Sequence, residues 1–268
     1  MSVTDTVFAG SIPAVYDRYM VPLVFRPYAE LLANRALALA PKRILETACG
    51  TGVVTQSLNQ ALPEAEIVAT DLNPPMLEQA ALRFGAPSVR FEQADALSLP
   101  FEDGSFDLVI CQFGVMFFPD KVMGNVEARR VLRDGGHYLL AIWDTVERNL
   151  ATRIAGAAVA ELFPDEPAAF YERIPFRYHD RQQIEADLRA AGFAEVRIDT
   201  VTLVSRAASA RDAAIGLTQG TPMRSEIEKR GPKALAAATD AAEAALGQFE
   251  GPNGFEAPMA AHIVTATK

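Results

Sequence analysis

The chain has 268 residues, half of them hydrophobic, with a formal net charge of −9 and a pI near 5.0. This length allows one large domain with a sizeable core, and we interpret the chain as one such domain with insertions. The acidic balance argues against nucleic acid as the main partner, because phosphate binding depends on a surface of clustered Lys and Arg.

Two further features of the sequence bear on where the protein works. No apolar run approaches the roughly 18 residues that a membrane-spanning helix needs. The first ten residues lack the basic start and the long apolar stretch of a signal peptide. We therefore expect a cytoplasmic protein without a membrane span.

The first half of the chain predicts a helical segment followed by a sheet. Residues 1–42 contain the aromatic-rich stretch FAGSIPAVYDRYMVPLVF and are expected to be helical. Residues 43–144 alternate β-rich runs with helical periodicity, the pattern of a doubly wound sheet. Right-handed crossovers place the C-terminal ends of the strands at one edge, where ligands bind in such sheets. The strands are expected at 43–49, 66–72, 89–94, 106–113 and 137–143.

After the fifth strand the alternation breaks. We expect a first helical insertion at 145–179, then a core helix and a sixth strand within 180–206. A second helical insertion at 207–255 carries an alanine-rich helix, and a final strand is expected within 256–268. We predict that both insertions form a lid beside the ligand-binding edge. Plain packing is the competing explanation of the alanine-rich helix.

A small-residue loop flanked by carboxylates follows the first strand. It reads LETACGTG at 45–52, and Asp71 ends the next strand, an order typical of a nucleoside site on a β-α-β unit. Glu46 argues against a dinucleotide, because a carboxylate beside the loop would repel a pyrophosphate, whereas it would attract a cationic cofactor. Thr55 also argues against a dinucleotide, because it stands where the dinucleotide fingerprint has its third glycine.

Four ordered blocks within residues 42–144 resemble the class I S-adenosylmethionine-dependent methyltransferases, in particular the small-molecule branch of the ubiquinone and menaquinone biosynthesis type. The blocks read RILETACGTG, IVATDLNPPMLEQA, VRFEQADALSLPFEDGSFDLVICQFGVMFFPD and RRVLRDGGHYLLAIWD. One position departs from the family pattern, because Ala48 replaces the usual first glycine of the loop. The resemblance implies an α/β, Rossmann-like doubly wound sheet of about seven strands, mostly parallel with the last antiparallel. It also implies S-adenosyl-L-methionine as cofactor and S-adenosyl-L-homocysteine as product.

The resemblance assigns cofactor contacts to residues at the strand ends. It places Glu46 at the ammonium of the methionine part and Asp71 at both ribose hydroxyls, through charge-assisted hydrogen bonds. Leu72 and Met76 would contact the face of the adenine ring. The full expected set is Tyr16, Glu46, Ala48, Gly50, Gly52, Asp71, Leu72, Met76, Asp95, Ala96, Gln112 and Phe113.

Competing structural interpretations stay open for several of these residues. For Glu46, a surface or helix-capping carboxylate is the alternative to a contact with the cofactor. Asp95 and the N–H of Ala96 would bind the polar edge of adenine, whereas a turn-forming residue is the alternative for Asp95. For Gln112 and Phe113, which end the fourth strand, simple strand packing competes with backbone contact to the amino group of the cofactor.

Acceptor binding is expected from segments outside the resemblance. In similar proteins the N-terminal segment folds over the methionine half of the cofactor, which would bring Tyr16 and Tyr19 to the methyl group. Phe176 and Tyr178 suit an apolar acceptor pocket, and His179 is the histidine best placed for a general base. For the N-terminal segment the alternative is a helix packed on the sheet edge. For Phe176 and Tyr178 it is a small satellite core, and for His179 it is a helix-capping or surface histidine.

The expected chemistry needs no obligatory catalytic side chain. Methyl transfer from a sulfonium is an in-line displacement, so the protein mainly supplies position, orientation and exclusion of water. The two cysteines and three histidines show neither a nucleophile–base arrangement nor a metal-type spacing. We predict an S-adenosylmethionine-dependent methyltransferase acting on a small molecule, without a metal. The alternatives are a non-catalytic S-adenosylmethionine-binding protein and, disfavoured by Glu46 and Thr55, an NAD(P)-dependent oxidoreductase.

Overall fold

The computed structural model describes residues 8, 10–82, 84 and 88–268, and these form two compact units. Each unit gathers segments that are far apart in the sequence. Unit 1 contains the N-terminal part up to Pro27, together with Asp144–Arg177 and Thr202–Ala260. Unit 2 contains Tyr28–Trp143, Tyr178–Val201 and Ala261–Lys268.

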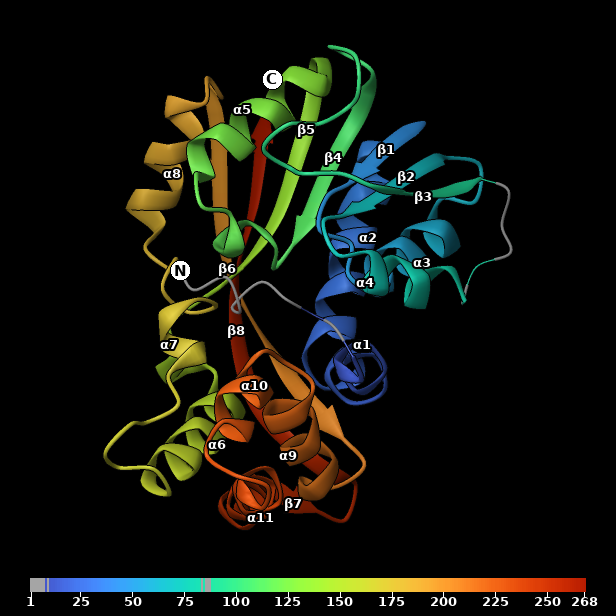
Figure 1. Ribbon diagram of the computed structural model, residues 1–268. Coiled ribbons are helices and arrows are strands. Elements are labelled where there is room, and N and C mark those ends of the chain that lie inside the picture. Colours follow the sequence, from blue (N-terminus) through green and yellow to red (C-terminus); the bar gives the residue numbers. More distant parts are fainter. Residues whose placement is uncertain (1–7, 9, 83, 85–87) are drawn as a thin grey trace. The chain divides into compact units, whose positions relative to one another are not determined.

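One sheet runs through the strand-forming segments, in the order β3-β2-β1-β4-β5-β8-β6, with β7 paired to β8 as a short hairpin (Figure 1). The pairs β1–β2, β1–β4, β2–β3 and β4–β5 are parallel, whereas β8 is antiparallel to β5. This topology confirms the expected Rossmann-like α/β fold with an antiparallel last strand. The strands are β1 (Arg43–Glu46), β2 (Glu66–Asp71), β3 (Val89–Gln93), β4 (Phe106–Gln112), β5 (Leu132–Trp143), β6 (Glu195–Ala207), β7 (Glu250–Gly251) and β8 (Gly254–Thr267).

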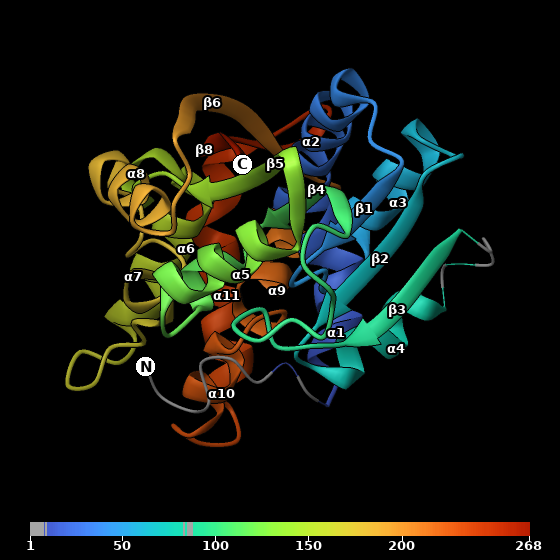
Figure 2. The same ribbon diagram turned by 90° about the horizontal axis from the view of Figure 1, so that it is seen from above.

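The sheet of unit 2 has a continuous apolar core. Central strand residues such as Ile44, Leu45, Ile67 and Val68 are fully buried, as expected for parallel strands covered by helices on both faces. Figure 2 shows α2 and α5 on opposite sides of β4 and β5, and α3 and α4 beside β2. The helices are α2 (Arg26–Leu39), α3 (Val53–Ala61), α4 (Pro74–Ala81), the short 3₁₀ helix η3 (Val115–Phe117), α5 (Lys121–Val131) and α8 (Arg181–Ala190).

Unit 1 is mainly helical. Small side chains allow α11 to pack closely against α6 and α9, and Ala214 and Ala238 are fully buried there. The buried hydroxyls of Thr218 and Thr239 pair with each other at 2.9 Å. The helices are α1 (Ile12–Val15), the π-helix η2 (Tyr16–Phe25), η4 (Val146–Arg148), α6 (Leu150–Glu161), α7 (Phe170–Arg173), α9 (Ala210–Gln219), α10 (Met223–Glu228), α11 (Ala234–Leu246) and η5 (Gly247–Phe249).

Most helix boundaries agree with the local signals. Pro74 opens α4, where its missing N–H costs nothing, and the Asp180 carboxylate caps α8 by accepting from the N–H of Gln182 at 2.8 Å. One boundary was wrong, because the strand expected to start at 137 already starts at Leu132, directly after α5 ends at Val131. The chain from Leu132 onward instead pairs with β4, through an irregular register.

Candidate functional site

The loop between β1 and α3 is held by both neighbouring strands. The N–H of Thr47 donates to the carbonyl of Ile110 in β4, and the N–H of Cys49 donates to the carbonyl of Thr70 in β2, each at 2.9 Å. Gly52 then starts α3 as its N-cap with φ of +80°, a conformation that favours glycine. The loop therefore has a fixed position at the C-terminal edge of the sheet.

Ala48 and Gly114 approach each other closely below this loop. Ala48 has φ of +52°, in the left-handed region that costs a non-glycine residue roughly 1–2 kcal/mol. A Cβ atom at Gly114 would lie 2.5 Å from the Cβ of Ala48 and 2.8 Å from the Sγ of Cys111. Glycine at 114 thus accommodates the alanine that replaces the usual loop glycine.

Asp71 ends β2 and organises the backbone around it. Its Oδ2 accepts from the N–H of Gly50 at 2.9 Å, and its Oδ1 accepts from the N–H and side-chain amide of Asn73 at 2.8 and 3.3 Å. Burial raises the pKa of Asp71, and these hydrogen bonds oppose that rise. A carboxylate offers about four lone-pair sites. The backbone N–H of Leu72 also lowers the pKa of Asp71 through a hydrogen bond, so this carboxylate is anchored to the chain on both sides of the strand end.

Glu46 ends β1 and is 2% exposed. The Thr55 hydroxyl of α3 donates to its Oε2 at 2.6 Å, the short distance typical of O–H···O⁻ bonds. Burial raises the pKa of Glu46 to about 8, the Thr55 bond lowers it, and the charge of Asp71 raises it further. Its burial shows that Glu46 is not a surface residue. It is not the cap of α3 either, because Gly52 has that position.

The residues expected around adenine differ in exposure. Met76 is buried in α4, whereas the apolar side chain of Leu72 is 54% exposed. Asp95 is exposed, and its Oδ1 accepts from the N–H of Leu97 at 2.9 Å, the geometry of a side-chain-stabilised turn. Ala96 within this turn is half-buried. Adenine binding by these residues stays a prediction.

Three aromatic rings meet at the ends of β4 and β5. Phe113, which follows Gln112, stacks on Trp143 with ring centroids 3.7 Å apart and planes 5° from parallel. Tyr28 meets both rings edge-on, at 5.4 and 5.7 Å, and its hydroxyl donates to the carbonyl of Val201 at 3.0 Å. Phe113 has φ of +54°, a strained conformation of the kind that clusters at functional sites.

Sequence reasoning selected Phe113 and missed its two partners. The signal that selected it, a position at the end of a strand, applies equally to Trp143. Tyr28 carries no such signal, because α2 reaches the sheet edge only through tertiary packing. Thr55 was noted as evidence against a dinucleotide, but its hydrogen bond to Glu46 was not foreseen.

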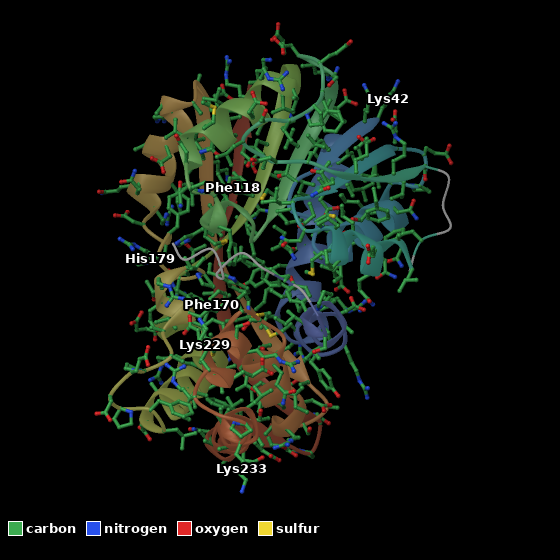
Figure 3. The ribbon with its side chains drawn as sticks, viewed as in Figure 1. Lys42, Phe118, Phe170, His179, Lys229 and Lys233 are labelled. Carbon is green, nitrogen blue, oxygen red and sulfur yellow. The ribbon has the colours of Figure 1, made fainter. Side chains whose placement is uncertain are left out.

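The expected acceptor residues of unit 2 make contacts within the fold. The hydroxyl of Tyr178 donates to Oδ2 of Asp187 at 2.8 Å, Lys121 lies over its ring, and burial raises its pKa. His179, labelled in Figure 3, is half-buried, and its carbonyl accepts from Nε2 of His262 at 2.9 Å. Roles of Tyr178 and His179 in acceptor binding stay predictions.

The expected residues of unit 1 also have internal partners. Tyr16 stacks on Phe25, with ring centroids 4.9 Å apart, and Tyr19 is half-buried in the same π-helix. Phe176 is buried, and its ring lies 6.4 Å from that of Tyr171. Figure 3 also labels the buried Phe170, which contacts Tyr171 in α7. Phe176 thus belongs to a local aromatic cluster, and its contact with an acceptor stays a prediction.

Two buried thiols flank the glycine loop. Burial raises the pKa of Cys111 to about 11 and that of Cys49 well above its usual value, so both are neutral near pH 7. Among the described residues, no three His, Cys, Asp or Glu side chains group as a metal site. No helix in the same part of the chain is long and apolar enough to cross a bilayer.

Residues 44–136 match the family model of a methyltransferase domain. A demethylmenaquinone methyltransferase from Deinococcus radiodurans is 44% identical over 136 residues, covering 49% of this chain and 56% of that protein. One from Clavibacter sepedonicus is 35% identical over 181 residues, covering 63% of this chain and 73% of that protein. The chain spans about half the length of the Deinococcus relative and of a Thermus thermophilus protein of the same name.

Solved structures share the fold at low sequence identity. An S-adenosylmethionine-dependent methyltransferase from Thermotoga maritima, described as a possible histamine N-methyltransferase, has a TM-score of 0.55 at 20% identity, covering 94% of each chain. A Haemonchus contortus N-methyltransferase solved with S-adenosylhomocysteine has a TM-score of 0.55 at 16% identity, covering 97% of this chain and 61% of that one. At these identities the likeness shows the fold alone.

Proposed function

The chain belongs to the class I S-adenosylmethionine-dependent methyltransferases, in their quinone-biosynthesis-like branch, and on that premise we propose that it transfers the methyl group of S-adenosyl-L-methionine to a small-molecule acceptor. The observation that carries this proposal is the pair of buried carboxylates, Glu46 and Asp71, on either side of the glycine loop. A cationic group favours the ionised form of these carboxylates and binds to it, whereas a pyrophosphate opposes their ionisation.

The residues present fit this cofactor. Asp71 is a buried carboxylate at the end of β2 beside the loop, held by the N–H of Gly50, and a carboxylate there suits the hydroxyls of a ribose. Within the described part of the chain, Thr55 is the one side chain recorded as donating to the Glu46 carboxylate. Glu46 is therefore able to receive the ammonium of the methionine part. The remaining expected contacts, from Tyr16 to Phe113, belong to the same proposal.

The chain's part in the reaction is to bind and orient. The cofactor supplies an electrophilic methyl group on a sulfonium, which an acceptor nucleophile attacks in line. The stacked rings of Phe113 and Trp143 are buried at the strand ends, each 6% exposed, and form a rigid packed core there. Such a core keeps water out of this end of the sheet. The names of the relatives, demethylmenaquinone methyltransferases, agree with an aromatic acceptor of the quinone class.

We extend the proposal to the surroundings of the site. Residues 1–42 and the insertions 145–179 and 207–255 would act as lids, with Tyr19, Phe176, Tyr178 and His179 facing the acceptor. The protein would work in the cytoplasm without nucleic acid as a partner, which its net charge of −9 supports. Hydrogen exchange with and without S-adenosylhomocysteine tests the lids, because ligand-dependent protection should then extend into these segments.

Calorimetric titration tests the cofactor. S-adenosylhomocysteine should bind at micromolar concentrations, whereas NAD and NADP should bind at least about a hundredfold more weakly, roughly 2.7 kcal/mol. Equal or tighter binding of a nicotinamide cofactor would refute the proposal. Turnover is then measured with demethylmenaquinone and with a panel of small hydroxyl and amine compounds. Cofactor binding without transfer to any acceptor would instead favour a non-catalytic S-adenosylmethionine-binding protein.

A further inference from the structure

Thr55 occupies an unusual place for a hydroxyl group. It is the third residue of α3 and is fully buried, and its side chain reaches back to the last residue of β1. The bond from its Oγ1 to Oε2 of Glu46 measures 2.6 Å. Ser57 on the same helix shows the ordinary alternative, since its hydroxyl donates to the backbone carbonyl of Val53 at 3.1 Å.

We propose that Thr55 is a positioning residue, whose hydroxyl holds the Glu46 carboxylate in the orientation that receives the ammonium of S-adenosylmethionine. This inference rests on the proposed function. Thr55 itself need not touch the cofactor, because it acts through Glu46. One carboxylate oxygen, Oε2, is engaged by the helix, and the planar carboxylate thereby directs the other oxygen away from α3.

The charges around Glu46 explain why such a fixed donor matters. Asp71 at the end of β2 opposes ionisation of Glu46 by like-charge repulsion, and burial opposes it more strongly. The Cys49 thiol of the loop and the Cys111 thiol of β4 also lie close enough to interact electrostatically with Glu46. Both are neutral near pH 7. The hydrogen bond from Thr55 opposes these effects and lowers the pKa of Glu46. The hydroxyl therefore favours the charged form of Glu46 that an ammonium requires.

This arrangement predicts proton release on binding. With its pKa near 8, Glu46 is mostly protonated at pH 7 in the absence of cofactor. An ammonium at the site favours the carboxylate and therefore displaces the proton. The affinity of S-adenosylhomocysteine should accordingly rise with pH up to about the pKa of Glu46. Thr55→Val should move the midpoint of that rise to higher pH.

The test compares two ligands on matched variants. S-adenosylhomocysteine carries the ammonium, whereas 5′-methylthioadenosine has the same adenosine and sulfur but no amino-acid end. At pH 7, Thr55→Val should lower the affinity for S-adenosylhomocysteine about tenfold or more, the usual effect of losing a charge-assisted bond. The affinity for 5′-methylthioadenosine should stay the same within about twofold. Thr55→Ser should restore binding of the first ligand. Ser57→Ala, which removes a hydroxyl from the same helix, should behave like the wild type.

The outcomes separate this inference from the function on which it rests. An unchanged affinity of Thr55→Val for S-adenosylhomocysteine, or an equal loss for both ligands, would overturn the positioning role. Wild-type protein that binds neither ligand would overturn the proposed function instead. If Thr55→Val does not fold, Thr55→Ala, which removes the same hydroxyl, takes its place in the same comparison of the two ligands. A loss confined to S-adenosylhomocysteine is expected, and an equal loss for both ligands or no loss would overturn the inference.

Discussion

The strand ends at β1 and β2 differ in kind from those at β4 and β5. The first pair ends in buried carboxylates, each held by donors from the glycine loop or the helices that follow. The second pair ends in rings that hold one another by stacking. Charged groups recognise a ligand atom by atom, whereas a ring surface recognises shape and excludes water. We call the ends of β1 and β2 the polar end of the sheet edge, and the ends of β4 and β5 the apolar end.

The two ends are joined at one close contact. Gly114 follows the ring-bearing Phe113, and its Cα hydrogens face the Cβ of Ala48 in the glycine loop. Ala48 and Phe113 both have positive φ, so backbone strain is present on each side of this contact.

The largest expected effect lies at the apolar end. Trp143→Ala removes a buried ring that packs on both Phe113 and Tyr28, and should lower the free energy of unfolding by about 3–5 kcal/mol. Trp143→Phe keeps an aromatic face and should lose far less. Chemical denaturation measures both variants. A Trp143→Ala variant of wild-type stability would show that the stacked rings do not hold this end of the sheet.

Asp71→Ala should come next, and it acts at the polar end. Loss of the carboxylate should cost about 2–3 kcal/mol of S-adenosylhomocysteine affinity, because charge-assisted bonds are lost. The bonds to Gly50 and Asn73 predict an additional stability loss of about 1–3 kcal/mol, since two partly buried N–H groups lose their acceptor. Calorimetry and denaturation separate the two losses, and normal affinity would remove Asp71 from the site.

The raised pKa of Glu46, at the polar end, predicts that the free energy of unfolding depends on pH. Because burial raises its pKa from its usual 4.5 to about 8, the folded state holds a proton that the unfolded state has released. Its contribution to stability is complete below pH 4.5 and is lost as the pH rises to about 8. Glu46→Gln should flatten the decline of unfolding free energy between these limits. An identical pH profile for both proteins would place the Glu46 pKa near its usual value.

The smallest expected effect measures strain at the apolar end. Phe113→Ala and Phe113→Gly remove the same ring, but glycine tolerates the φ of +54° without the Cβ penalty. The glycine variant should therefore be more stable than the alanine variant by about 1 kcal/mol. Paired denaturation curves provide the measurement. The reverse order would mean that the backbone relaxes out of the left-handed region once the ring is gone.

Much of the polar end was predictable from the sequence. Glu46 and Asp71 each end an apolar strand, and the intervening GTG run requires a tight turn, so their placement follows from local pattern and spacing. The apolar end was only half predictable. Phe113 and Trp143 lie about thirty residues apart, and their stacking depends on the pairing of β4 with β5. The early start of β5 at Leu132 was missed for the same reason, since it depends on long-range pairing with β4.

The order of strands and helices, the glycine loop and the two carboxylates follow from short-range pattern, because periodicity and turn chemistry act over a few residues. Tertiary structure alone decided which donors these carboxylates have and which rings meet. Thr55 reaches Glu46 because α3 follows β1 and packs back on its end, and Tyr28 reaches Phe113 and Trp143 because α2 packs on one side of β4 and β5. Such contacts join residues whose separation in sequence carries no signal, so the free energy of packing selects them.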